Sequence, residues 1–214
     1  METRVLSFFA VSIGLFASLP AIADTVTFDF LALHPVTGDM GVSSFGFTSG
    51  GRTLTASGYY TPSNAAQHLY IKNGGTGESG LGLIADSADH EVEAIDFIQL
   101  DLSSLIAAGY TNFTITLGSL QSGEGGKITF SGTGGTLTGG IGGTTLTGGA
   151  LIQTWAFTDT SYSFVDITGT GVSGGDVILA SVTATSVPDE SRTAIMLVPA
   201  LLALALFRAR RRCR

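Results

Sequence analysis

Cysteine and positive charge are the two things this chain has least of. Its 214 residues include one cysteine, Cys213, and residues 24–186 carry 14 acidic side chains but only three basic ones, Arg52, Lys72 and Lys127. A small exported domain held together by disulfides needs cysteine pairs, so that class is excluded. A formal charge of −11 over residues 24–186 repels phosphate backbones, and we therefore expect no nucleic-acid binding.

Helical periodicity is also scarce. One short segment, residues 102–108 followed by Gly109, fits a helix that ends at a glycine. Elsewhere, short runs of Thr, Val, Ile and aromatic residues alternate with Gly and Ser, as in residues 26–30 and 113–117. This pattern predicts about 10 to 12 short strands in an all-β domain. A jelly-roll-like β-sandwich is the first interpretation and a β-barrel the second.

The N-terminal segment has the pattern of a secretory signal peptide. Arg4 is followed by an apolar run over residues 5–19, and Ala21 and Ala23 supply the small residues expected before a cleavage point at Asp24. We therefore predict a signal peptide over residues 1–23 and an exported domain over residues 24–186. An uncleaved membrane anchor is the alternative.

The C-terminal segment, residues 187–214, has three parts. Residues 187–191 read Val187-Pro188-Asp189-Glu190-Ser191, an apolar run follows over residues 194–207, and the chain closes with Arg208, Arg210, Arg211, Arg212 and Arg214. A helix over the apolar run would span roughly 21 Å, less than the ~30 Å hydrocarbon core of a bilayer. The arginine cluster nevertheless fits a cytoplasmic stop signal. We predict a short transmembrane helix that holds the chain in the inner membrane.

This arrangement resembles the PEP-CTERM class of sorting signals, and the motif at residues 187–191 is similar to its Val-Pro-Asp-Ser-Gly variant. The resemblance implies an exosortase-like membrane protease or transpeptidase as a partner, in a Gram-negative bacterium that makes exopolysaccharide. It also implies cleavage near the Val-Pro motif and a final place at the cell surface or outside the cell.

Residues 123–149 are unusually rich in glycine, with 12 glycines in 27 residues and the sequence Thr-Leu-Thr-Gly-Gly repeated. A glycine-rich repeat suggests a calcium-binding β-roll, but that motif requires aspartate in each turn and this stretch has none. We predict a loose hairpin or edge strands, open to pairing with another chain.

A cluster of acidic residues is the best candidate for a ligand site. Its members fall within 11 residues of the sequence: Asp86, Asp89, Glu91, Glu93 and Asp96. Such carboxylates repel one another unless a hard cation with six to eight oxygen ligands lies between them, so Ca²⁺ is the predicted cofactor. A solvated acidic loop without metal is the alternative.

Nothing in the sequence marks out a catalytic site. Residues 169–175 match two glycine motifs of nucleotide-binding proteins and hydrolases, but both mechanisms need a following helix, and a strand pattern follows here. We interpret that segment as a hairpin turn. Trp155, Tyr59 and Tyr60 could stack on sugars, although aromatic residues in strands usually belong to the core. We expect a non-enzymatic surface or matrix protein, with a Ca²⁺-dependent carbohydrate-binding module and a secreted polysaccharide hydrolase as the alternatives.

Overall fold

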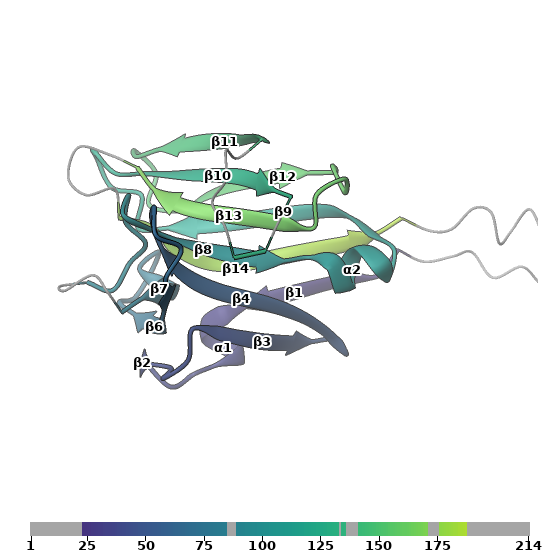
Figure 1. The fold of residues 1–214 in the computed structure, drawn as a ribbon, viewed down its shortest axis with the longest axis horizontal. Coiled ribbons are helices and arrows are strands. Elements are labelled where there is room, and N and C mark those ends of the chain that lie inside the picture. Colours follow the sequence, from purple (N-terminus) through teal and green to yellow (C-terminus); the bar gives the residue numbers. More distant parts are fainter. Residues whose placement is uncertain (1–22, 85–88, 133, 136–140, 171–175, 188–214) are drawn as a thin grey trace, which may run out of the picture. The chain divides into compact units, whose positions relative to one another are not determined.

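The computed structural model describes residues 23–84, 89–132, 134–135, 141–170 and 176–187. Two antiparallel sheets pack face to face and two short helices lie beside them (Figure 1), which confirms the all-β, sandwich-like prediction. Within the described part of the chain, no helix is both long enough and apolar enough to cross a membrane. The signal peptide and the C-terminal helix are predicted for residues outside this part.

The first sheet, sheet A, has seven strands. In spatial order they are β12 (Gln153–Phe157), β9 (Tyr110–Gly118), β14 (Ile178–Ser186), β7 (Ser79–Leu83), β6 (Leu69–Asn73) and β2 (Gly38–Asp39), with β1 (Thr25–Asp29) also paired to β14. The last strand, β14, therefore pairs with β1 and β7 from the first half of the chain and with β9 from the middle.

The second sheet, sheet B, also has seven strands. Their order is β11 (Ile141–Thr147), β10 (Gly125–Ser131), β13 (Phe164–Gly169), β8 (Asp96–Asp101), β4 (Arg52–Tyr60) and β3 (Ser44–Ser49), with β5 (Ala66–Gln67) also paired to β4. The described residues thus form 14 strands, slightly more than the alternation alone predicts.

The core lies between the two sheets and follows from period-2 alternation. In β4, Leu54 and Ala56 are fully buried while their neighbours in the strand face outward. In β9, Phe113 and Ile115 are buried in the same alternating way. Because each strand contributes every second side chain, two sheets of short strands produce one apolar layer without any disulfide.

Local signals for turns and helices are mostly confirmed. Gly50 and Gly51, with φ of +54° and +72°, join β3 to β4. Helix α2 (Ser103–Ala107) occupies the predicted position, and Gly109 follows it at φ +89°. A second helix, α1 (Phe30–Leu33), was not predicted. It begins because the Asp29 side chain accepts a hydrogen bond from the Ala32 amide.

Two expectations about the second half of the chain had different outcomes. Strand β11, inside the glycine-rich stretch, is an edge strand of sheet B paired with β10, as predicted. Strands β13 and β14 do not pair as a hairpin, because β13 belongs to sheet B and β14 to sheet A, and residues 171–175 of the predicted turn lie outside the described residues. Local turn signals identify a reversal of the chain but not the sheet in which the next strand lies.

The two ends of the sandwich domain are neighbours. Asp24 donates its backbone amide to Ser186 Oγ at 2.9 Å, and its carbonyl accepts from the Ser186 amide at 2.8 Å. The buried Tyr110 donates its hydroxyl to Asp24 Oδ2 at 2.5 Å, and this bond, with burial, raises the pKa of Tyr110. The start of β1 and the end of β14 therefore lie together, while the β6–β7 hairpin lies at the other end of the long axis (Figure 1).

Candidate functional site

A partly buried group of polar side chains lies at the β6–β7 end of sheet A. We call it the Lys72 cluster, and its members are Lys72, Glu78, Glu91, Ser119 and Gln121. They come from three places in the sequence: the β6–β7 hairpin, the segment before β8 and the loop that follows β9. The cluster contains one residue of the predicted acidic group, Glu91.

Gly82 makes room for this cluster. In β7, Leu81 and Leu83 point into the core, so Gly82 between them faces the outer surface of sheet A. A β carbon on Gly82 would lie 1.9 Å from the carbonyl oxygen of His90. The segment that carries Glu91 therefore lies against the backbone of β7, where only glycine leaves enough space.

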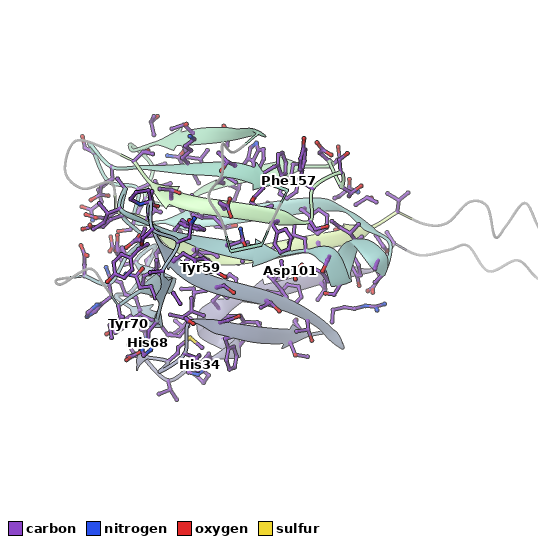
Figure 2. The ribbon with its side chains drawn as sticks, viewed as in Figure 1. His34, Tyr59, His68, Tyr70, Asp101 and Phe157 are labelled. Atoms are coloured by element: carbon purple, nitrogen blue, oxygen red, sulfur yellow. The ribbon has the colours of Figure 1, made fainter. Side chains whose placement is uncertain are left out.

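Backbone conformations on both sides of the cluster are unusual for residues other than glycine. His90 has φ +60° and Ser119 has φ +58°. Tyr70 stacks on the His90 ring with centroids 4.0 Å apart, and the Ser119 amide donates to the Gly77 carbonyl at 2.7 Å. In Figure 2 the labelled Tyr70 marks the side of the domain on which this cluster lies, and Phe157 on β12 lies far from it. Residues held in sparsely populated conformations often belong to functional sites, because the surrounding packing must maintain them.

Lys72 connects the two carboxylates of the cluster. Its Nζ contacts Glu91 Oε1 directly and lies 3.4 Å from Glu78 Oε2, and the Glu91 side chain is only 2% exposed. Glu78 also accepts hydrogen bonds from Ser119 Oγ at 3.1 Å and from Gln121 Nε2 at 3.0 Å. Glu91 Oε2, by contrast, is buried without a hydrogen-bond partner in the described structure.

The electrostatics of the cluster bring the titration of Glu91 close to neutral pH. Burial raises the pKa of Glu91 to about 7, a rise that hydrogen bonding by Lys72 and Ser119 and the charge of Lys72 only partly oppose. Burial would lower the pKa of Lys72, but its hydrogen bonds to Glu91 and Glu78 and their charges outweigh it, so the pKa of Lys72 is raised. The cluster therefore holds a cation beside a carboxyl group that changes its charge near neutral pH.

The other predicted calcium ligands that the structure describes, Asp89, Glu93 and Asp96, do not form a metal-binding group with Glu91. Asp96 is fully buried and accepts a hydrogen bond from the Glu93 amide at 2.7 Å, which closes the turn before β8. Asp89 contributes a charge that helps raise the pKa of Glu91, and Asp86 lies outside the described residues. Among the described residues, no group of three or more His, Cys, Asp or Glu side chains is placed to hold a metal ion. The Ca²⁺ site stays a prediction.

A second buried carboxyl group lies on the outer face of sheet B. Asp166 in β13 is fully buried, and its Oδ1 accepts from Gln99 Nε2 at 2.7 Å. Gln99 Oε1 in turn accepts from the Gly135 amide at 2.6 Å, so Gly135 of the glycine-rich stretch lies against this pair. Burial raises the pKa of Asp166 to about 7, which the Gln99 hydrogen bond only partly opposes.

These two carboxyl groups cannot act together as a glycosidase pair. Glu91 lies on the outer side of sheet A and Asp166 on the outer side of sheet B, with the apolar core between them. Retaining and inverting glycosidases need their two carboxyl groups about 5–10 Å apart on either side of one glycosidic bond. The two raised pKa values therefore do not define a shared catalytic site.

The outer face of sheet A carries rows of hydroxyl groups. Thr25 and Thr27 in β1 pair with Thr185 and Thr183 in β14, with hydroxyl oxygens 3.1 Å apart in both pairs. Thr183 is also opposite Thr114 in β9. We call this surface the threonine face, formed by Thr25, Thr27, Thr114, Thr183 and Thr185. Strand spacing of ~4.8 Å repeats these hydroxyls regularly, an arrangement suited to hydrogen bonding with a polyhydroxylated polymer.

The aromatic residues suggested for sugar stacking belong to different environments. Trp155 is partly buried against the apolar core and packs on Phe157 and Phe130, with centroids 4.9 and 5.7 Å apart. Tyr59 stacks on the buried Phe97 at 5.1 Å, and Tyr60 is exposed. They do not form one platform.

Two residues of the candidate sites have only weak signals in the sequence. Lys72 is one of three basic residues in an acidic region, and Asp166 is a charge inside a short apolar strand. Neither signal identifies the partner residue.

Comparison of the chain with models of known protein families, with curated proteins and with solved structures gave no match.

The predicted processing points fall partly within the described structure. Ala23, Asp24 and Val187 are described, and Val187 is exposed. Ala21, the rest of the Val-Pro motif and the terminal arginines lie outside the described residues.

Proposed function

We propose that this chain is an exported, non-enzymatic protein of the cell surface or exopolysaccharide matrix, sorted through its C-terminal segment by an exosortase-like enzyme. The proposal rests first on the sequence: a secretory pattern in residues 1–23, and the Val-Pro motif, short apolar run and arginine cluster in residues 187–214. These features concern the location of the exported domain. Contact between that domain and polysaccharide is a separate part of the proposal.

The observation that best supports this proposal is the pairing of the two domain ends. Asp24, the predicted mature N-terminus, is hydrogen-bonded to Ser186, next to the predicted sorting motif. A chain held in the membrane at residues 194–207 would then keep its folded domain close to the bilayer at this end. Within the sandwich, the β6–β7 hairpin lies at the opposite end from Asp24 and Ser186 (Figure 1).

The finer architecture and the surface agree with this role. A jelly-roll-like sandwich fits the pairing of the first strand β1 with the last strand β14. The acidic, cysteine-free domain and its threonine face suit a hydrated polysaccharide environment. Under the calcium hypothesis, Ca²⁺ ions would bridge the carboxylates of this acidic domain to acidic sugars of the polysaccharide.

Processing of the C-terminal segment is the first prediction. Replacing Pro188 and Asp189 with Ala, or separately the five terminal arginines with Ser, should leave an unprocessed chain in the inner membrane. The first change removes the extended recognition motif, and the second removes the cytoplasmic stop signal. Fractionation with mass spectrometry of the wild type should show a surface or released form that begins at Asp24 and lacks residues 192–214. A surface form that still contains Cys213 would contradict the sorting proposal.

A carbohydrate-binding module is the second candidate function, and the threonine face favours it. Replacing Thr27, Thr114 and Thr183 with Val keeps strand propensity and side-chain shape but removes the aligned hydroxyls. If this face binds polysaccharide, the triple variant should bind exopolysaccharide several-fold more weakly in a sedimentation assay.

The matched control replaces Thr48, Thr53 and Thr55 with Val on sheet B, and it should bind normally. The assay is repeated with a calcium chelator, because the calcium-dependent version of this function predicts loss of binding in the wild type as well. Equal binding by both triple variants would argue against a role for the threonine face.

A further inference from the structure

The Lys72 cluster brings together the parts needed for an internal amide bond. Lys72 Nζ contacts the carboxyl group of Glu91, which belongs to a segment 19 residues further along the chain. Glu78 Oε2 lies 3.4 Å from the same nitrogen. An amine, an acyl group and a nearby carboxylate that can exchange protons are therefore in contact.

The surroundings limit access of water to the acyl group. The Glu91 side chain is 2% exposed, whereas Lys72 and Glu78 are 18% and 23% exposed. Glu91 Oε2 has no hydrogen-bond partner in the described structure, although it is buried. A buried oxygen without a hydrogen bond destabilises the folded protein. If Glu91 lost this oxygen as water on forming an amide with Lys72, that cost would disappear, and so would the partly buried ion pair between the two residues.

We propose that Lys72 and Glu91 condense to form an intramolecular amide cross-link, with Glu78 as the proton acceptor. The inference does not depend on the proposed function. It would give the cysteine-free domain a covalent link between β6 and the segment before β8. Holding the two groups in contact replaces the high concentration that the same reaction would need between separate molecules.

The proposed reaction balances without any other reactant. The Lys72 ammonium group gives one proton to the Glu78 carboxylate, and the neutral nitrogen attacks Cδ of the protonated Glu91 carboxyl group. The C–N bond forms and the bond from Cδ to the Glu91 hydroxyl breaks. That hydroxyl leaves as water with a second proton from the nitrogen, transferred through Glu78. The third proton stays on the amide, and Glu78 returns the first one to solvent.

The pattern of basic residues allows a direct test on the protein isolated from its producing cells. After denaturation in urea, trypsin should cleave after Arg52 and Lys127 but not after Lys72, because an acylated lysine has no charge. The expected product is one peptide, residues 53–127, lighter by the mass of one water molecule. Recovery of residues 53–72 and 73–127 as separate peptides with unmodified masses would overturn the proposal.

Variants separate the cross-link from a plain ion pair. Lys72→Arg keeps the charge but cannot be acylated in this way, so its peptides should be unmodified. Its Tm should fall by roughly 10 °C, as expected for opening a covalent loop of about 20 residues. Glu91→Gln should still condense, and its peptide should be lighter by one ammonia instead of one water. Glu78→Gln should leave Lys72 free, and full cross-linking in that variant would overturn the role assigned to Glu78.

Discussion

Replacing Gly82 with Ala should destabilise the domain by about 3–5 kcal/mol. The added β carbon would lie 1.9 Å from the His90 carbonyl oxygen, and this obstacle is backbone and not the flexible end of a side chain. Either β7 or the segment through His90 must move. Because the Leu83 amide donates to the same carbonyl at 3.2 Å, movement of that segment also breaks a backbone hydrogen bond.

The effect of Gly82→Ala should be concentrated near the Lys72 cluster. Moving His90 also moves Glu91 away from Lys72, so amide protons of residues 89–92 should exchange faster even where the rest of the sandwich remains folded. Urea unfolding measures the loss of free energy, and hydrogen exchange shows where it occurs.

Gly132→Ala is the matched control for this substitution. Among the described residues other than its chain neighbours, no atom lies within 4 Å of a β carbon at that position, so the unfolding free energy should change by less than about 1 kcal/mol. Equal stability of the Gly82→Ala variant and the wild type would show that β7 and the His90 segment are not in this close contact.

The second large effect is a loss of stability as the pH rises from about 4 to about 7, caused by Asp166. Burial raises the pKa of Asp166 from 3.8 to about 7 in the folded protein. Below pH 4 the folded and unfolded chains both hold the proton. Between these values only the folded chain holds it, so raising the pH favours unfolding. The loss is complete above about pH 7 and amounts to at most about 4 kcal/mol.

Asp166→Asn isolates this contribution. Its side chain can still accept the hydrogen bond from Gln99 but cannot ionise, so the dependence due to Asp166 should disappear. The amide group has no acceptor at the position of Oδ2, which has no hydrogen-bond partner in the described structure, and this should cost about 1–3 kcal/mol. The variant should therefore be less stable than the wild type near pH 4 and nearly equal to it, or more stable, near pH 8.

The measurement is urea unfolding at a series of pH values, with the wild type and Asp166→Asn compared at each one. Taking the difference between the two removes the contribution of every other titrating group, including Glu91. A difference that stays constant from pH 4 to pH 8 would show that Asp166 is ionised in the folded protein over this whole range.

Much of the local structure could be predicted from the sequence. Alternating residues such as Val26, Phe28, Phe113 and Ile115 are buried as the period-2 pattern indicates, because side chains on a strand must face opposite sides. Gly109 ends α2 because the chain there has a positive φ that glycine adopts without strain. The scarcity of cysteine likewise determined that apolar packing, and not disulfides, forms the core.

The candidate sites were decided by the tertiary structure. Glu91 was predicted as one of five calcium ligands, but it contacts Lys72, which comes from a different part of the chain. Asp166 meets Gln99 at a separation of 67 residues, and Asp24 meets Ser186 at a separation of 162. Residue patterns report which face of a strand is buried. Which strands become neighbours depends on how both sheets bury their apolar faces together, and that is a property of the whole chain.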